Sequence, residues 1–279
     1  MAKPTRTSSN AIAMHAVLGG YTIIALFPIY MVLANSFKNR AEIFRNPMVP
    51  PTPDSFTTIG FSTVWQRSAF ETFFGNSLIV TLVSLFLVLL TGAMAAWALS
   101  EYKFRGNILL SVYLALGIMI PIRLGTVSIL RLVVDLNLID TLTALVLVYT
   151  AQGLPLAIFI LSEFMRQIPK ELKEAARVDG VTEYWIFFRI VLPLTRPAIA
   201  TVAVFTMIPI WNDLWFPLIL TSSESTKTIT LGVQTFIGQY VTDWNAVLAS
   251  LTLAIVPIVA LYLIFSRQLI RGLTSGAVK

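Results

Sequence analysis

The sequence predicts an all-α membrane protein with six transmembrane helices. Of the 279 residues, 56% are hydrophobic and only 12% are charged, whereas about a quarter of the residues in soluble domains are charged. Runs of about twenty apolar residues suffice to cross the ~30 Å hydrocarbon core as helices. None of the runs alternates polar and apolar residues as an outer-membrane strand does. The runs span residues 12–34, 75–99, 108–127, 142–161, 197–221 and 246–265.

Composition also excludes several kinds of site. The chain has no cysteine and one histidine, His15, which rules out disulfides, thiol catalysis and Cys- or His-rich metal sites. The net charge is +6, yet the basic residues are spread between apolar runs instead of massed on one segment. We therefore expect cytoplasmic Lys and Arg of a membrane protein, with lipid and not nucleic acid as a partner.

The first run, 12–34, is expected to be a retained helix because no small-residue cleavage site follows it. The third and fourth runs are the least regular, since Arg123 and Arg131 lie at the end of one and Asp140 just before the other.

The distribution of Lys and Arg indicates orientation. If both termini are cytoplasmic, 13 of the 20 basic residues lie in inner segments, which is the bias that cytoplasmic loops show. The predicted organisation is a cytoplasmic tail (1–11), a transmembrane domain (12–267) and a second cytoplasmic tail (268–279). The transmembrane domain includes an extracytoplasmic loop (35–74), where prolines favour an extended, folded-back path, and a cytoplasmic loop (163–196). For the last outer loop, the sequence is compatible with either a re-entrant helix or a helix on the membrane surface.

The cytoplasmic loop holds two predicted short amphipathic helices. Pro169 suits a helix start, Gly180 favours a helix end, and Thr182 is a candidate cap for the second helix. Such a pair could lie on lipid headgroups. Ala175 and Ala176 favour a docking helix instead, because small side chains let another protein approach closely.

The spacing of this loop resembles a known signature. Glu174-Ala175-Ala176, then Gly180, then Ile190, Leu192 and Pro193 are similar to the EAA loop of ATP-binding-cassette importer membrane subunits. The segments "NSFK" (35–38), "FGNSLIVTL" (74–82), "AAWALSEYKFRG" (95–106) and "WND" (211–213) resemble carbohydrate-uptake permeases of this family. The similarity covers nearly the whole chain and is closest to the second permease of maltose-type transporters.

The resemblance implies a type I importer fold with a cytoplasmic coupling helix, in the bacterial cytoplasmic membrane. It implies transport of a carbohydrate or related polyol, a partner ATPase dimer, a second homologous permease and an extracytoplasmic substrate-binding protein. The chain lacks a G-x-x-x-x-G-K-[ST] loop, so ATP and Mg are expected on the ATPase, with no cofactor and no catalysis here. The implied docking residues are Glu171, Glu174, Ala175, Ala176, Asp179, Gly180 and Pro193.

Polar residues within the runs suggest a substrate path. An ionisable group in a span usually faces a bundle interior or a cavity, and the candidates are Tyr149, Gln152, Trp211, Asn212 and Asp213. Asp213 could instead bind backbone groups freed by Pro209 and Pro217. Gly153-Leu154-Pro155 is more simply a packing break, Arg123 is expected to extend to lipid headgroups, and Asn76 is expected near a helix start.

Two other functions were compared with the importer. An ion-gradient-driven secondary transporter is the main alternative, but no repeat relates the two halves and the docking loop would be unexplained. An intramembrane enzyme would need a nucleophile with a base or paired metal ligands, which one histidine and no cysteine do not supply.

Overall fold

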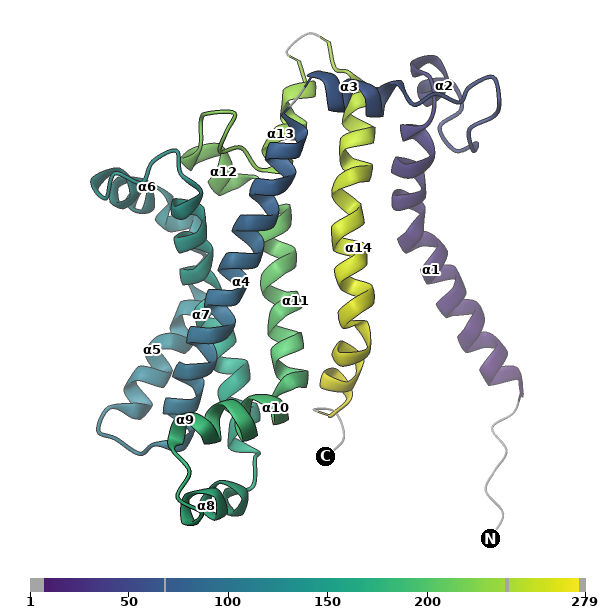
Figure 1. Cartoon of the computed structure of the whole chain (residues 1–279). Coiled ribbons are helices and arrows are strands. Elements are labelled where there is room, and N and C mark those ends of the chain that lie inside the picture. The colour runs from purple at the N-terminus through teal and green to yellow at the C-terminus, as the bar shows by residue number, and fades with distance from the viewer. Residues whose placement is uncertain (1–7, 68, 239–240, 276–279) are drawn as a thin grey trace. The chain divides into compact units, whose positions relative to one another are not determined.

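The computed structural model describes residues 8–67, 69–238 and 241–275, and in that part of the chain it consists of helices joined by turns and loops (Figure 1). Its described residues form no strand, only the isolated bridges Lys38–Phe56 and Ile237–Thr242. The all-α prediction is therefore confirmed. The predicted tails 1–11 and 268–279 lie partly outside the described residues.

The elements are α1 (Ser8–Ser36), α2 (Arg40–Arg45), α3 (Ile59–Arg67), α4 (Phe70–Glu101), α5 (Asn107–Met119), η1 (Ile122–Gly125), α6 (Thr126–Asp135), α7 (Leu142–Arg166), α8 (Lys170–Val178), α9 (Glu183–Ile186), η2 (Phe187–Val191), α10 (Leu192–Leu194), α11 (Arg196–Asn212), α12 (Trp215–Leu220), α13 (Ile229–Val233), η3 (Gln234–Phe236) and α14 (Trp244–Ser275).

Three described helical segments are long and apolar enough to cross a membrane: Ala11–Ser36, Phe70–Glu101 and Leu142–Arg166. Two bent helix pairs raise the number to five if each is one span: Asn107–Met119 with Ile122–Asp135, and Glu183–Leu194 with Arg196–Asn212. The apolar part of α14, Trp244–Ala260, is shorter. The chain is thus a multi-pass helical protein by composition, and the count of six is not confirmed.

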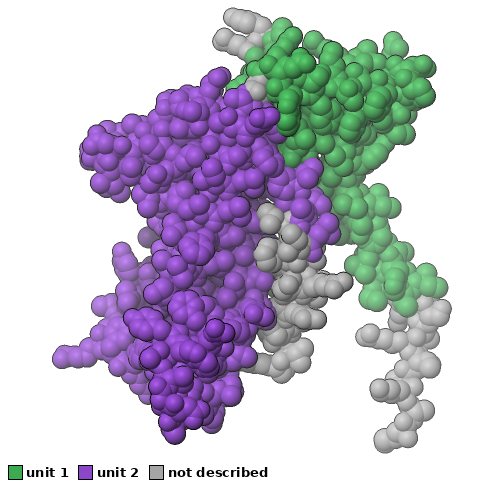
Figure 2. Space-filling model, viewed as in Figure 1, with its two compact units in different colours: residues 1–68, 233–255 green, residues 69–232, 256–279 purple. Residues whose placement is uncertain are grey.

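The chain divides into two compact units (Figure 2). The first comprises residues 1–68 and 233–255 and includes residues 35–68 of the predicted outer loop, 35–74, whose last residues belong to α4. That loop is not simply extended, because it forms α2 and α3. The buried Lys38 binds several parts of this loop. Its Nζ donates to Asn35 Oδ1 at 3.0 Å and to the Asn46 carbonyl at 2.8 Å. Burial lowers the pKa of Lys38 below its ordinary value.

The second unit comprises residues 69–232 and 256–279, and α4 packed along α7 forms its centre. Gly153 permits this close approach, since a Cβ there would lie 2.8 Å from Val88 Cγ2. The hydrophobic core beside it includes the buried side chains of Val88, Ala157, Leu161, Ile186 and Val202. Helix α7 continues through Pro155 without interruption. Gly153 therefore serves packing, but the segment is not the break that the sequence suggested, because α7 is continuous there.

The third predicted span, 108–127, is not one helix. Helix α5 ends at Met119, and Ile120 and Pro121 are extended, with ψ of 114° at both. Proline disfavours the helical conformation of the residue before it. The chain therefore turns by 88° before η1 and α6, and the prediction of a straight span here is wrong.

The fifth predicted run, 197–221, is also interrupted. Helix α11 ends at Asn212, Asp213 is extended with ψ of 133°, and α12 begins at Trp215. The break places the backbone of Asp213 outside any helix, between the end of α11 and the start of α12.

Asn76 does not start a helix, contrary to the sequence-based expectation. Helix α4 begins at Phe70, and the buried Asn76 lies inside it. Its amide donates to the carbonyls of Ser225 and Lys227 at 2.8 and 2.9 Å. The next residue, Ser77, accepts a 2.8 Å bond from the Ile229 backbone N–H. These bonds hold the loop after α12 against α4.

Candidate functional site

The predicted docking segment folds as two short helical pieces joined at a glycine. Helix α8 ends at Val178, and Gly180 then adopts a left-handed φ of 77°, which a residue without Cβ tolerates best. The Thr182 hydroxyl caps the next piece by accepting from the Trp185 N–H. That piece runs through α9, η2 and α10 to Leu194, and Pro193 lies inside α10. Both helices and both end signals match the prediction.

Helix α8 divides the motif between two faces. Glu171, Glu174, Ala175 and Val178 are exposed, and their i, i+3, i+4, i+7 spacing places them on one stripe of a helix. Val178 is 88% exposed, which is unusual for a branched apolar side chain on a polar helix. Asp179 and Gly180 are exposed at its end. Ala176 lies in the core cluster with Trp97 and Ile186, so it belongs to the inner face.

Four charged side chains fasten the inner face of α8. Lys173 contacts Glu101 Oε2 at the end of α4, and the Arg177 guanidinium donates to Glu101 Oε1 at 2.7 Å. Arg177 Nε also donates to Glu183 Oε1 at 2.6 Å, and the Tyr102 hydroxyl donates to Glu183 Oε2 at 3.0 Å. These bonds, to Glu183 first and Glu101 second, raise the pKa of Arg177.

This network is largely withdrawn from solvent on the α4 side. The side chains of Lys173 and Glu101 are 6% and 11% exposed, and Lys173 Nζ lies 5.4 Å from the centre of the Trp97 ring. Removing one partner of a buried ion pair costs about 3–5 kcal/mol, because the other charge is left uncompensated. The network is therefore expected to hold α8 firmly on the end of α4.

Sequence analysis did not identify Glu101 as a site residue. Its partners lie 72 and 76 positions later in the chain, and no local pattern connects them. The available signal was an acidic residue closing a 25-residue apolar run beside a basic loop, which is a weak one.

A second cluster surrounds Asp213 at the break between α11 and α12. Asp213 Oδ2 accepts from the Tyr149 hydroxyl at 2.9 Å and from the Phe216 N–H at 3.0 Å. Asp213 Oδ1 accepts from Arg123 of η1 at 3.3 Å. Asp213 therefore binds side chains of α7 and η1 and an N–H in the first turn of α12. This differs from the expected bonds to groups freed by Pro209 and Pro217, because a proline leaves a carbonyl unpaired and a carboxylate does not accept from a carbonyl.

Arg123 is turned toward this cluster, which differs from the expected extension to lipid headgroups. Its guanidinium carbon lies 5.7 Å from the centre of the Trp215 ring, and Trp215 Nε1 donates to Thr126 Oγ1 at 3.0 Å. The side chain of Arg123 is still 65% exposed. The bend at Pro121 places η1 where it can contact α12. A straight span, as expected from the sequence, did not predict this contact.

The five predicted path residues do not form one lining. Arg123 and Gln152 border an open hollow of about 630 Å³ between α5, η1 and α7, with Gly117 and Leu156 on its apolar side. Tyr149 is buried behind it. Trp211 is buried against Phe74, with ring centres 5.9 Å apart. Asn212 is exposed and donates to the Ile208 carbonyl of its own helix.

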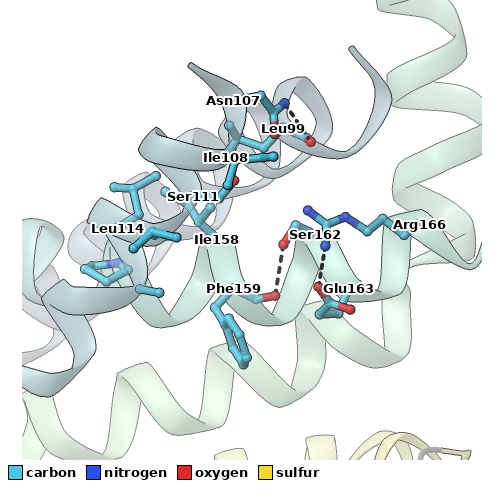
Figure 3. Close-up of a pocket in the computed structure, with 13 residues that line it drawn as sticks. Leu99, Asn107, Ile108, Ser111, Leu114, Ile158, Phe159, Ser162, Glu163 and Arg166 are labelled. Atoms are coloured by element: carbon cyan, nitrogen blue, oxygen red, sulfur yellow. Dashed lines mark hydrogen bonds and ion pairs between the residues drawn. The ribbon is translucent and has the colours of Figure 1, made fainter. Parts of the chain in front are cut away.

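A separate pocket of about 340 Å³ lies between α5 and α7 (Figure 3). Asn107 at one end donates to the Leu99 carbonyl at 3.1 Å, and Glu163 pairs with Arg166 at 2.7 Å. It contains none of the predicted path residues, so it adds nothing to the Asp213 cluster.

The described residues contain no group of three or more His, Asp or Glu side chains placed to hold a metal ion.

Comparison with known proteins places the chain in a family. Residues 88–275 match the family described as binding-protein-dependent transport system inner membrane component. The chain belongs to this family. It is 39% identical over 265 residues to a putative ABC transporter permease of a Caldicellulosiruptor species, covering 94% of each chain. It is 34% identical over 258 residues to an arabinooligosaccharides transport system permease of Halalkalibacterium halodurans, covering 92% of each.

A solved structure shows the same fold. A chain of a bacterial ABC transporter involved in the import of alginate superposes with a TM-score of 0.79, at 20% identity, covering 95% of this chain and 99% of that one. The membrane component described here thus has the type I importer permease fold, as the EAA resemblance implied.

Proposed function

We propose that this chain is the membrane permease subunit of an ATP-driven importer that carries a carbohydrate or related polyol across the cytoplasmic membrane. The observation that carries the proposal is the exposed stripe of Glu171, Glu174, Ala175 and Val178 on a helix anchored to α4. The stripe offers two carboxylates and two small or branched apolar side chains on one face of an anchored helix, a mixed surface that a protein partner can cover. Membership of a binding-protein-dependent transport family supports this assignment.

The docking face has distinct roles for its residues. Glu174 supplies a charge for a basic residue of a partner ATPase, and Ala175 leaves room for close approach. Ala176 packs α8 on the core, Gly180 turns the chain, and Asp179 is exposed beside it. Pro193 begins the return toward α11.

The energy source lies in the partner. The chain has no phosphate-binding loop, so ATP and Mg bind to an ATPase dimer, and this chain contributes no catalysis and no cofactor site. A second homologous permease completes the pathway, and an extracytoplasmic binding protein delivers the cargo. The alginate importer structure and the arabinooligosaccharide relative support this class of cargo and assembly.

The orientation follows from the docking face. If α8 is cytoplasmic, the loop 163–196 is cytoplasmic, and so is the end of α4 at Glu101, which contacts α8. The loop 35–74 is then extracytoplasmic and both termini are cytoplasmic, which agrees with the Lys and Arg bias.

The substrate path is proposed at the Asp213 cluster. Asp213 and Gln152 offer hydroxyl-binding groups, the buried Tyr149 holds the Asp213 carboxylate in place, and Trp215 offers an aromatic face beside Arg123. Saccharides combine these two needs, since their hydroxyls hydrogen-bond and their ring faces stack on aromatic side chains. Trp211 and Asn212 remain candidates only through a rearrangement of α11.

The test is retention of the ATPase. The unmodified chain and its partners are purified from the membrane, and Glu174→Lys is compared with Glu224→Lys on the exposed outer loop. We expect the ATPase to dissociate from the Glu174 variant only. Retention in both variants contradicts the docking face. Uptake that survives ATP depletion but stops on collapse of the ion gradient indicates the secondary transporter instead.

A further inference from the structure

Glu101 occupies an unusual place at the junction of two helices. It is the last residue of α4, and its two carboxylate oxygens are taken by two residues of α8. Oε2 contacts Lys173, and Oε1 accepts from Arg177 at 2.7 Å. Lys173 and Arg177 are four positions apart and therefore lie on one face of α8, opposite the exposed stripe. One carboxylate thus forms ion pairs with two side chains of α8 that lie about one helical turn apart.

Apart from the ion pairs, the inner face of α8 meets α4 through Lys173 Nζ, which lies 5.4 Å from the centre of the Trp97 ring, and through Ala176. Ala176 is the one residue of α8 in the core cluster, and it offers a single methyl group. The larger apolar side chains, Leu172 and Val178, are exposed. A methyl contact alone gives weak mechanical coupling, because it has neither charge nor direction. The ion pairs therefore carry most of the connection between α8 and α4.

Helix α4 continues from these ion pairs to the opposite end of its unit. Asn76 and Ser77 near its start hold the backbone of Ser225, Lys227 and Ile229. The 25 residues from Asn76 to Glu101 span about 38 Å of helix. Figure 1 shows α8 beyond one end of α4 and the loop after α12 near the other. One uninterrupted helix thus has a specific polar attachment at each end.

We propose that Glu101 is the positioning residue that transmits the movement of α8 to α4, and through α4 to the loop of residues 222–229. When a partner ATPase displaces α8, the doubly held carboxylate carries α4 with it. The movement reaches the loop through Asn76 and Ser77. Coupling of this kind is reciprocal, so an event at the outer loop also biases α8. The proposal rests on the function proposed above.

The charge of Glu101 can be removed with little change in shape. In the complex with the ATPase and the binding protein, we expect Glu101→Gln to keep the ATPase bound, because the exposed stripe is unchanged. The stimulation of ATP hydrolysis by loaded binding protein, and the cargo moved per ATP, should fall about tenfold. A purely structural loss would reduce hydrolysis and transport together and leave their ratio unchanged.

A matched control uses an ion pair that does not connect two helices. Glu163 pairs with Arg166 within α7 at 2.7 Å, and both side chains are about half exposed (Figure 3). Glu163→Gln should leave the ratio of transport to hydrolysis unchanged. Equal ratios in the Glu101 and Glu163 variants overturn the proposal.

A charge exchange covers the case in which a single variant folds poorly. Glu101→Lys and Lys173→Glu should each uncouple transport, whereas the double variant restores the pair between positions 101 and 173 and should recover the ratio in part. Recovery is incomplete because Arg177 then faces a lysine and keeps only its bond to Glu183. A double variant no better than either single one overturns the proposal. ATPase retention by the unmodified complex is measured first, because its failure contradicts the docking function and not the role of Glu101.

Discussion

The Tyr149 hydroxyl donates a 2.9 Å hydrogen bond to Asp213, which joins the middle of α7 to the break between α11 and α12. The same carboxylate also accepts from the N–H of Phe216, the second residue of α12. A single side chain therefore sets both the position of the break and its attachment to α7. Arg123 adds an ion pair at 3.3 Å, but its exposure means that this pair contributes less than about 1 kcal/mol to stability.

Tyr149→Phe should destabilise the protein. The change removes a buried donor to a charged acceptor, and such bonds contribute about 1.5–3 kcal/mol. Thermal unfolding in lipid nanodiscs measures the loss. Tyr113→Phe on α5 is the matched control, because Tyr113 is 70% exposed, and it should stay within about 0.5 kcal/mol of the unmodified protein. Equal effects at the two tyrosines would mean that the bond to Asp213 contributes nothing.

Gly153→Ala should also destabilise, through overpacking. The added Cβ would lie 2.8 Å from Val88 Cγ2 and 3.2 Å from Thr206 Cγ2, and overpacking of this kind costs about 1–3 kcal/mol. At Gly75, a Cβ meets nothing within 4 Å. Gly75→Ala should therefore be neutral or gain up to about 1 kcal/mol of helix propensity. The sign of the difference between the two variants, measured by unfolding, tests whether α4 and α7 approach as closely as described.

Local signals in the sequence predicted local features well. The ends of α8 and of the following helix were predicted because Gly180 and Thr182 act on the backbone within a few residues. The bend at Pro121 had a local signal too, since proline constrains the residue before it. The length of the apolar run outweighed that signal, and the sequence was therefore interpreted as a straight span.

Contacts between distant elements were not predictable in the same way. Asn76 reads as a cap in sequence, but its partners are 149 and 151 positions away. Glu101 and Arg123 likewise find partners across the fold. The side of a helix that meets a neighbour depends on packing, and one sequence without structure does not fix it. The division of the EAA motif into an exposed and a buried face required the structure for the same reason.

Asp140 should make the loop after α12 sensitive to pH. It accepts from the Thr226 hydroxyl and from the backbone N–H groups of Ser222 and Ser223, and these bonds, Thr226 first, hold the pKa of Asp140 well below its usual range. A carboxyl whose pKa is lower in the folded state stabilises the fold at any pH above its unfolded pKa of about 3.9. This stabilisation is lost progressively as the pH falls below that value.

Asp140→Asn removes this effect while keeping the backbone, because Asn tolerates the positive φ of 58° at this position. At pH 7 the variant should show faster amide exchange than the unmodified protein in residues 221–228. The difference should begin to shrink below about pH 4, where the carboxyl of the opened loop becomes protonated, and should be lost as the pH approaches the lower pKa of the native carboxyl. A difference that is independent of pH would show that the ionised state of Asp140 is not what holds the loop.

Gly180 offers a test of the docking geometry that leaves the exposed stripe unchanged. Its φ of 77° lies in the left-handed region, which costs a residue with a Cβ about 1–2 kcal/mol, while Asn adopts it more readily than Ala. Gly180→Ala should therefore misdirect the end of α8 and weaken ATPase binding by up to about tenfold, whereas Gly180→Asn should weaken it less. No atom lies within 4 Å of the added Cβ, so a steric clash does not explain a difference between the two variants. Titration of the detergent-solubilised complex with purified ATPase ranks them, and an equal loss for Ala and Asn would contradict a conformational role for this glycine.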